Sequence, residues 1–182
     1  MTKQILALGA SNSKNSINKT FAKHTGEFLL NQFPEYQLKV LDLNDFEMPI
    51  YSIDRENENG VPDKANRFLA SILESDGIIL SLAEHNGAYT AAFKNIYDWA
   101  SRIEKDVWQN KPMLLLSTSP GPRGATFVLD LAQRTYQFSN KNQILRFSLP
   151  SFNNNFSKTE GIKDAVLLEA FEKQVQLFNA AL

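Results

Sequence analysis

Residues 9–18 (GASNSKNSIN) are a segment of small polar side chains that could bind a phosphate group. The segment leads from an apolar run into a helical pattern whose apolar positions begin at Ile17. The first N–H groups of a helix lack partners within it, and its positive end attracts anions. Lys14 either adds charge to such a site or lies in solvent. Further donors come from three hydroxyls, any one of which could instead only cap the helix: Ser11, Ser13 and Ser16.

Residues 83–88 (AEHNGA) form a second polar segment, which suits the edge of a flat heterocycle. The amide of Asn86 carries both a donor and an acceptor, and the carbonyls and ring nitrogens of an isoalloxazine need both. Gly87 leaves its backbone groups accessible. His85 either stacks on such a ring or is solvated.

Residues 117–125 (STSPGPRGA) form a third segment, with two glycines and two prolines in nine residues. That composition gives an irregular backbone that can approach a ligand closely. Its N–H groups could face the pyrimidine end of a flavin. Arg123 either stabilises the negative charge of a reduced flavin or points to water.

Two common nucleotide motifs are missing from the sequence. Neither the dinucleotide pattern G-x-G-x-x-G nor the P-loop pattern G-x-x-x-x-G-K-[ST] occurs. A monophosphate bound without magnesium and without crowded glycines suits FMN better than NAD or ATP.

Five apolar runs alternate with five helical patterns, which is typical of a parallel sheet covered by helices on both faces. We therefore predict one α/β domain over residues 1–182, a flavodoxin-like three-layer sandwich whose five-stranded parallel sheet has the order 2-1-3-4-5. This order brings the three polar segments to one edge of the sheet, because they follow strands 1, 3 and 4. The expected strands are Gln4–Leu8, Gln37–Leu41, Gly77–Leu82, Pro112–Ser117 and Gln143–Phe147.

Two stretches lack a clear period. Residues 46–61 are expected to form a long loop after the second strand, which either has a function or is a plain surface excursion. Residues 149–158, after the fifth strand, are expected to be irregular as well.

Composition excludes several classes of function. The chain has no cysteine, so disulfides, iron–sulfur clusters and thiolate metal sites are absent, and we predict no metal site. A net charge of −1 gives no field for nucleic acid. No apolar run approaches the roughly 18 residues of a membrane span. The first apolar run reads as a strand rather than a secretion signal, and we expect a cytoplasmic protein.

Four motifs occur in the same order as in a known family. The approximate pattern G-S-x-R-x-x-S-x-N is matched at Ser11, Ser16 and Asn18, and P-E-Y-N-G corresponds to residues 83–87. The pattern K-N-x-x-D-W-x-S appears as Lys94, Asn95, Asp98, Trp99 and Ser101. The pattern S-x-S-P-G-x-x-G appears as Ser117, Ser119, Pro120, Gly121 and Gly124. Over residues 4–149 the chain thus resembles the NADPH-dependent FMN reductase family, which includes quinone, chromate and azo-dye reductases.

The resemblance implies an FMN enzyme that takes hydride from NADPH or NADH and passes electrons to a quinone, free flavin or another small acceptor. The flavin would do the chemistry, so no side chain is assigned as acid or base. A homodimer or homotetramer is implied, with Trp99 and Trp108 as candidate contacts between subunits and Tyr97 either at such a contact or in the core. The implied cofactor-binding residues are Ser11, Ser13, Ser16, Ile17, Asn18, Glu84, His85, Asn86, Gly87, Ser117, Ser119, Gly121 and Gly124.

The chain departs from the family at three positions of these motifs. Ser13 stands where the family has an arginine, Ala83 where it has a proline and His85 where it has a tyrosine. The missing arginine removes a charge-assisted hydrogen bond, so we expect weaker binding of FMN than is usual in the family.

Other functions fit less well. A non-enzymatic flavin-binding electron carrier, or a family member without activity, remains open, although a carrier is usually more acidic than this chain. A serine hydrolase would need a histidine in reach, and only His24 and His85 exist. A receiver domain would need acidic residues where Gly9, Ala10 and Ser11 stand.

Overall fold

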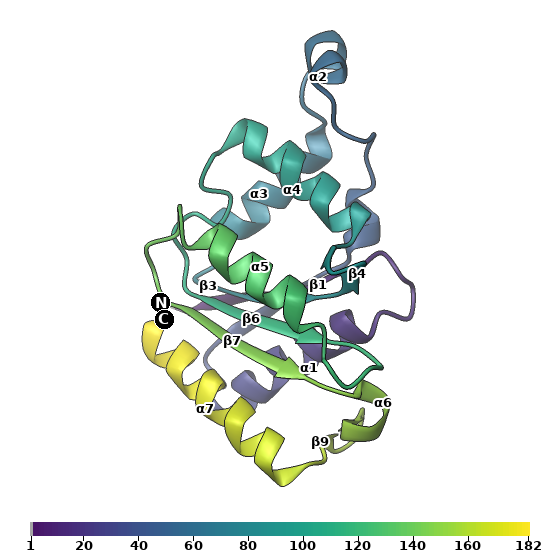
Figure 1. Cartoon of the computed structure of the whole chain (residues 1–182). Helices are drawn as coiled ribbons and strands as arrows, with labels where there is room; N and C mark the ends of the chain where they lie inside the picture. Colours follow the sequence, from purple (N-terminus) through teal and green to yellow (C-terminus); the bar gives the residue numbers. More distant parts are fainter. Residues whose placement is uncertain (1) are drawn as a thin grey trace.

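A computed structural model describes residues 2–182 as a parallel five-stranded sheet between two layers of helices (Figure 1). The strands stand in the order β2-β1-β3-β6-β7, which is the predicted order 2-1-3-4-5. The predicted fold is therefore confirmed. The strands of the sheet are β1 (Gln4–Ala10), β2 (Gln37–Leu41), β3 (Gly77–Leu82), β6 (Met113–Thr118) and β7 (Ile144–Leu149).

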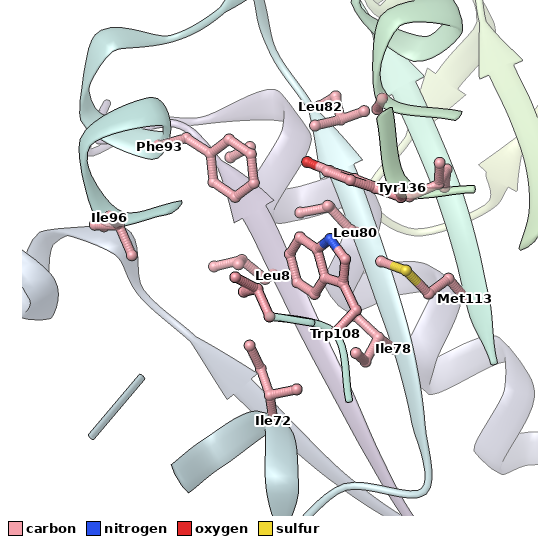
Figure 2. Packing of buried hydrophobic residues seen from close by; sticks show 14 of the residues in the cluster. Leu8, Ile72, Ile78, Leu80, Leu82, Phe93, Ile96, Trp108, Met113 and Tyr136 are labelled. Carbon is pink, nitrogen blue, oxygen red and sulfur yellow. The ribbon is translucent and has the colours of Figure 1, made fainter. Parts of the chain in front are cut away.

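Both faces of the sheet are buried, as the long apolar runs require. On β1, Ile5 and Ala7 pack toward α1 and α7, whereas Leu6 and Leu8 pack toward the other layer. Figure 2 shows this second core, in which side chains from strands and helices meet around Trp108. The first layer consists of α1 (Ile17–Gln32) and α7 (Ala165–Ala181), and the second of α3 (Asp63–Leu73), α4 (Ala91–Ile103) and α5 (Thr126–Tyr136).

Two tryptophans expected at a subunit contact lie inside the protein. Trp99 and Trp108 are only 1% and 0% exposed, so the prediction that they form a contact between subunits is wrong. Tyr97 is half-buried and packs on Trp108, with 5.9 Å between ring centroids. Burial raises the pKa of Tyr97 to about 12, so its hydroxyl stays protonated near neutral pH.

Residues 46–61 are not wholly a loop, contrary to the prediction. They contain the end of η1 (Leu43–Phe46) and all of α2 (Ile53–Asn59), a short helix that stands away from the sheet (Figure 1). No residue of α2 is buried, and so its sequence has no apolar stripe by which it could be recognised.

The segment before α2 is fastened to α4 by residues of one family motif. The amide of Asn95 accepts a hydrogen bond from Tyr51 N at 2.8 Å and donates to Met48 O at 3.1 Å. The indole of Trp99 donates to Pro49 O at 2.7 Å. Asn95 and Trp99 of this motif therefore hold the segment that follows β2.

Residues 149–158 were also expected to be irregular, and the structure corrects this. They include α6 (Phe152–Asn155) and β8 (Phe156–Ser157). Strand β8 pairs with β9 (Gly161–Ile162) in an antiparallel hairpin beside α1. Both elements are too short to show a period in sequence.

Among residues 2–182, no helix has the length and apolar character needed to cross a membrane.

Candidate functional site

The three polar segments converge at the carboxyl edge of the sheet and line one groove. The groove encloses about 220 Å³ and is open to solvent. It lies where β1, β3 and β6 end side by side, which is where ligands bind in open α/β sheets. Its walls are formed by Ser11, Ser13, Asn15, Ser16, Ile17, Asn18, Ala83, Glu84, His85, Thr118, Ser119 and Pro120.

Most of the predicted cofactor-binding residues are in this groove, and some are not. The prediction missed Asn15, Ala83, Thr118 and Pro120, each of which adjoins a predicted residue in the chain. That adjacency was the only signal in sequence. The predicted residues outside the lining are Asn86, Gly87, Ser117, Gly121 and Gly124.

The first segment presents donors at the start of α1. Ser16 caps the helix by accepting a hydrogen bond from Lys19 N at 3.1 Å, and Ser11 Oγ accepts one from Ser13 N at 3.2 Å. A hydroxyl that accepts in this way keeps its own hydrogen for a ligand. Within residues 2–182, the N–H groups of Ile17 and Asn18 have no acceptor. Capping and phosphate binding are therefore compatible at this loop.

Asn18 links the first segment to β3 and to the third segment. Its side chain is 3% exposed, and its Oδ1 accepts hydrogen bonds from Ser81 Oγ at 2.7 Å and from Thr118 N at 3.2 Å. Its Nδ2 donates to Thr118 O at 3.1 Å. The amide is thus occupied inside the protein, where it ties the start of α1 to β3 and to the end of β6.

The second segment is a β-hairpin formed by β4 (Glu84–His85) and β5 (Ala88–Tyr89). Its two turn residues, Asn86 and Gly87, have φ values of 52° and 77°. A two-residue turn with positive φ at both positions favours Asn followed by Gly. This pair is explained by the turn itself, and the hairpin residues that line the groove are Glu84 and the exposed His85.

Two hydrogen bonds hold the hairpin in place. The Glu84 carboxylate accepts from Val128 N at 3.1 Å in the first turn of α5, so it caps that helix. Thr90, which caps α4, donates to Ala10 O at 3.0 Å at the end of β1. The hairpin is thereby connected to the first turn of α5, and the residue that follows it is connected to the first segment.

The third segment is folded against the loop that follows β7. Ser117 is fully buried and donates to Gly124 O at 2.7 Å. Gly124 has φ +57°, and a Cβ there would lie 2.3 Å from Ser148 Oγ. These two family residues therefore shape the loop, while Ser119 and Pro120 face the groove.

Arg123 does not line the groove. Its guanidinium lies 4.9 Å from the ring centroid of Phe127 on α5, in a cation–π contact with a half-exposed ring. The arrangement gives no support to a role for Arg123 in stabilising reduced flavin.

The groove fits the phosphate end of FMN. Backbone N–H groups at a helix start and three serine hydroxyls match the oxygens of a phosphate. Ligand pockets usually enclose about 300–1,000 Å³, so this groove alone would hold part of FMN and leave the rest near solvent.

The topology and the groove together define a flavodoxin-like protein with a loop of small polar residues after its first strand. Residues 4–156 match the family described as NADPH-dependent FMN reductase. The chain belongs to this family, as its motifs predicted.

A plant relative and two solved structures show what the chain resembles. The NADPH:quinone oxidoreductase of Arabidopsis thaliana is 29% identical over 130 residues, which are 71% of this chain and 65% of that protein. The chain thus spans less than two thirds of this relative.

The solved structures share the fold at low identity. FerB, a flavoenzyme NAD(P)H:(acceptor) oxidoreductase from Paracoccus denitrificans, has a TM-score of 0.71 at 22% identity, covering 99% of this chain and 97% of FerB. The apo form of the NADH:FMN oxidoreductase EMOB has a TM-score of 0.76 at 18% identity, covering 100% and 90%. Both likenesses concern the fold.

Proposed function

We propose that this chain is an FMN-dependent oxidoreductase that takes hydride from NADPH or NADH and passes electrons to a quinone, free flavin or a similar small acceptor. The observation that carries the proposal is the convergence of three polar segments, far apart in sequence, in one groove at the end of β1, β3 and β6. Family membership supports the same reaction class.

Different residues of the groove would bind different parts of FMN. The hydroxyls of Ser11, Ser13 and Ser16, with the N–H groups of Ile17 and Asn18, would hold the phosphate. His85, Ser119 and Pro120 would border the ring. FMN, when bound, supplies the redox chemistry by accepting a hydride from the nicotinamide and passing the electrons to the acceptor.

The same proposal covers the assembly and the location. We propose a single FMN-binding domain that forms a homodimer or homotetramer through a surface other than the buried Trp99 and Trp108. The cytoplasmic location and the absence of a nucleic-acid partner stay predictions.

Anaerobic reduction and steady-state turnover test this function. The protein loaded with FMN should lose its yellow colour when NADPH is added without oxygen, and it should oxidise NADPH continuously when a benzoquinone is supplied. If the flavin stays bound but nicotinamide does not bleach it, the chain is a carrier or an inactive relative instead of a reductase.

A further inference from the structure

A second groove beside the FMN site is lined by lysines. It encloses about 330 Å³ and shares Asn15, Ser16 and Ile17 with the first groove, so the two adjoin at the start of α1. None of its lining residues is acidic, although the whole chain has a net charge of −1. The lining residues are Lys14, Asn15, Ser16, Ile17, Lys19, Thr20, Lys23, Phe152 and Lys158.

The four lysines come from three parts of the chain and differ in their partners. Lys19 forms an ion pair with Asp42, which lowers the pKa of that carboxyl, and Lys23 lies 3.4 Å from Glu27. Among the described residues, Lys14 and Lys158 have no carboxylate partner and are exposed. Two uncompensated positive charges thus remain for an anion.

Lys158 is held at this groove by packing between α1 and the β8–β9 hairpin. The ring of His24 on α1 meets Phe156 edge to face, with 5.0 Å between ring centroids. On the other strand, a Cβ at Gly161 would lie 2.7 Å from His24 Cε1, so glycine permits this close approach. Lys158 also lies beyond residues 4–156, the part that matches the family.

Resting on the proposed function, we infer that this second groove, which we call the lysine groove, binds the 2′-phosphate of NADPH. A nicotinamide stacked on the flavin ring can extend its longer dinucleotide along the ribityl chain and past the FMN phosphate. The lysine groove adjoins the first groove at Asn15, Ser16 and Ile17, so the adenosine end of such a dinucleotide would be within its reach. A phosphate monoester dianion is what distinguishes NADPH from NADH, and two unpaired lysines favour it. Phe152 supplies an apolar wall beside it.

The test compares binding of 2′,5′-ADP with that of 5′-AMP, by calorimetry on protein loaded with FMN. Wild type should bind 2′,5′-ADP about tenfold more tightly, and the double variant Lys14→Gln/Lys158→Gln should lose that selectivity. The ratio of kcat/KM for NADPH to that for NADH should fall by a similar factor. Selectivity should also weaken as salt rises, because these charges are exposed to solvent.

A matched control variant changes the net charge by the same amount as the test variant. Lys105→Gln/Lys173→Gln removes two exposed lysines outside the lysine groove and should leave the selectivity as in wild type. Equal binding of the two nucleotides by wild type would overturn the inference. The inference would also be overturned if Lys14→Gln/Lys158→Gln lost FMN but still bound 2′,5′-ADP more tightly than 5′-AMP, because the two lysines would then bind the FMN phosphate. Failure of flavin reduction with intact selectivity for 2′,5′-ADP would instead count against the proposed function alone.

Discussion

The loops at the carboxyl edge contain two sets of polar residues that look alike in sequence and differ in position. The linking residues are Asn18, Glu84 and Thr90, whose side chains form hydrogen bonds to other elements, and Ser117, whose hydroxyl bonds within its own loop. Two groove residues, Ser13 and His85, are exposed and make no such link. A family motif therefore records how the loops are held together as well as what they bind.

Replacement of a linking residue should have the largest effect on stability. Asn18→Ala leaves the buried Ser81 hydroxyl and Thr118 backbone without partners, and should lower the free energy of unfolding by about 3 kcal/mol. Urea denaturation measures this. The exposed Asn15 serves as the control, and Asn15→Ala should change stability by less than about 0.5 kcal/mol. An Asn18→Ala protein as stable as wild type would contradict the linking role of Asn18.

Gly124→Ala should have the next largest effect. It combines a positive φ with a Cβ 2.3 Å from Ser148 Oγ and 3.0 Å from Pro150 N, and should cost about 2 kcal/mol. Gly121 lies in the same loop with a nearest atom at 3.8 Å, so Gly121→Ala should be close to neutral. Thermal unfolding of both variants checks this, and equal melting temperatures would contradict it.

A change in a groove residue should alter binding without altering stability. Ser13→Arg restores the charge found in the family and should lower the Kd for FMN about fivefold, which corresponds to about 1 kcal/mol of binding free energy. Quenching of FMN fluorescence on titration with the protein gives the Kd. Since Ser13 is exposed, the unfolding transition should stay where it is in wild type. Unchanged affinity would mean that the phosphate lies elsewhere.

The smallest effect concerns His24, which belongs to neither set. Burial among Phe156 and Phe171 lowers the pKa of His24. The nearby Glu27 carboxylate raises this pKa by a smaller amount. Lys23 and Lys158 also border the pocket around His24. The unfolded chain then binds a proton more readily than the folded one, so stability falls as pH drops below about 6.5.

Unfolding at pH 7.5 and 5.5 reveals this contribution. The loss between the two pH values should be smaller in His24→Gln than in wild type, by less than about 1 kcal/mol because His24 is partly exposed to solvent. An equal loss in both proteins would assign the pH dependence to other groups.

The sheet could be predicted well because the central strands β1, β3 and β6 are apolar runs buried on both faces, and the edge strands β2 and β7 still carry several apolar residues. Sequence reasoning also found the three loops, since small polar residues, glycine and proline gather where β1, β3 and β6 end. It missed α2, whose residues bury nothing, and it misplaced Trp99, whose burial depends on the segment fastened over α4. The lysine groove could not be predicted from the sequence, because Lys14 and Lys158 are brought to one groove only by the packing of the β8–β9 hairpin on α1.

If the start of α1 holds the FMN phosphate, a negative charge placed there should release the flavin, and an absorption spectrum measures the flavin that stays bound. Wild-type protein and Ser16→Asp are incubated with FMN, desalted and compared. Aspartate caps a helix as well as serine does, but its charge repels a phosphate. We predict the two-banded flavin spectrum in wild type and at least tenfold less bound flavin in an equally stable Ser16→Asp variant. Equal flavin in both, or a colourless wild type, would contradict the claim.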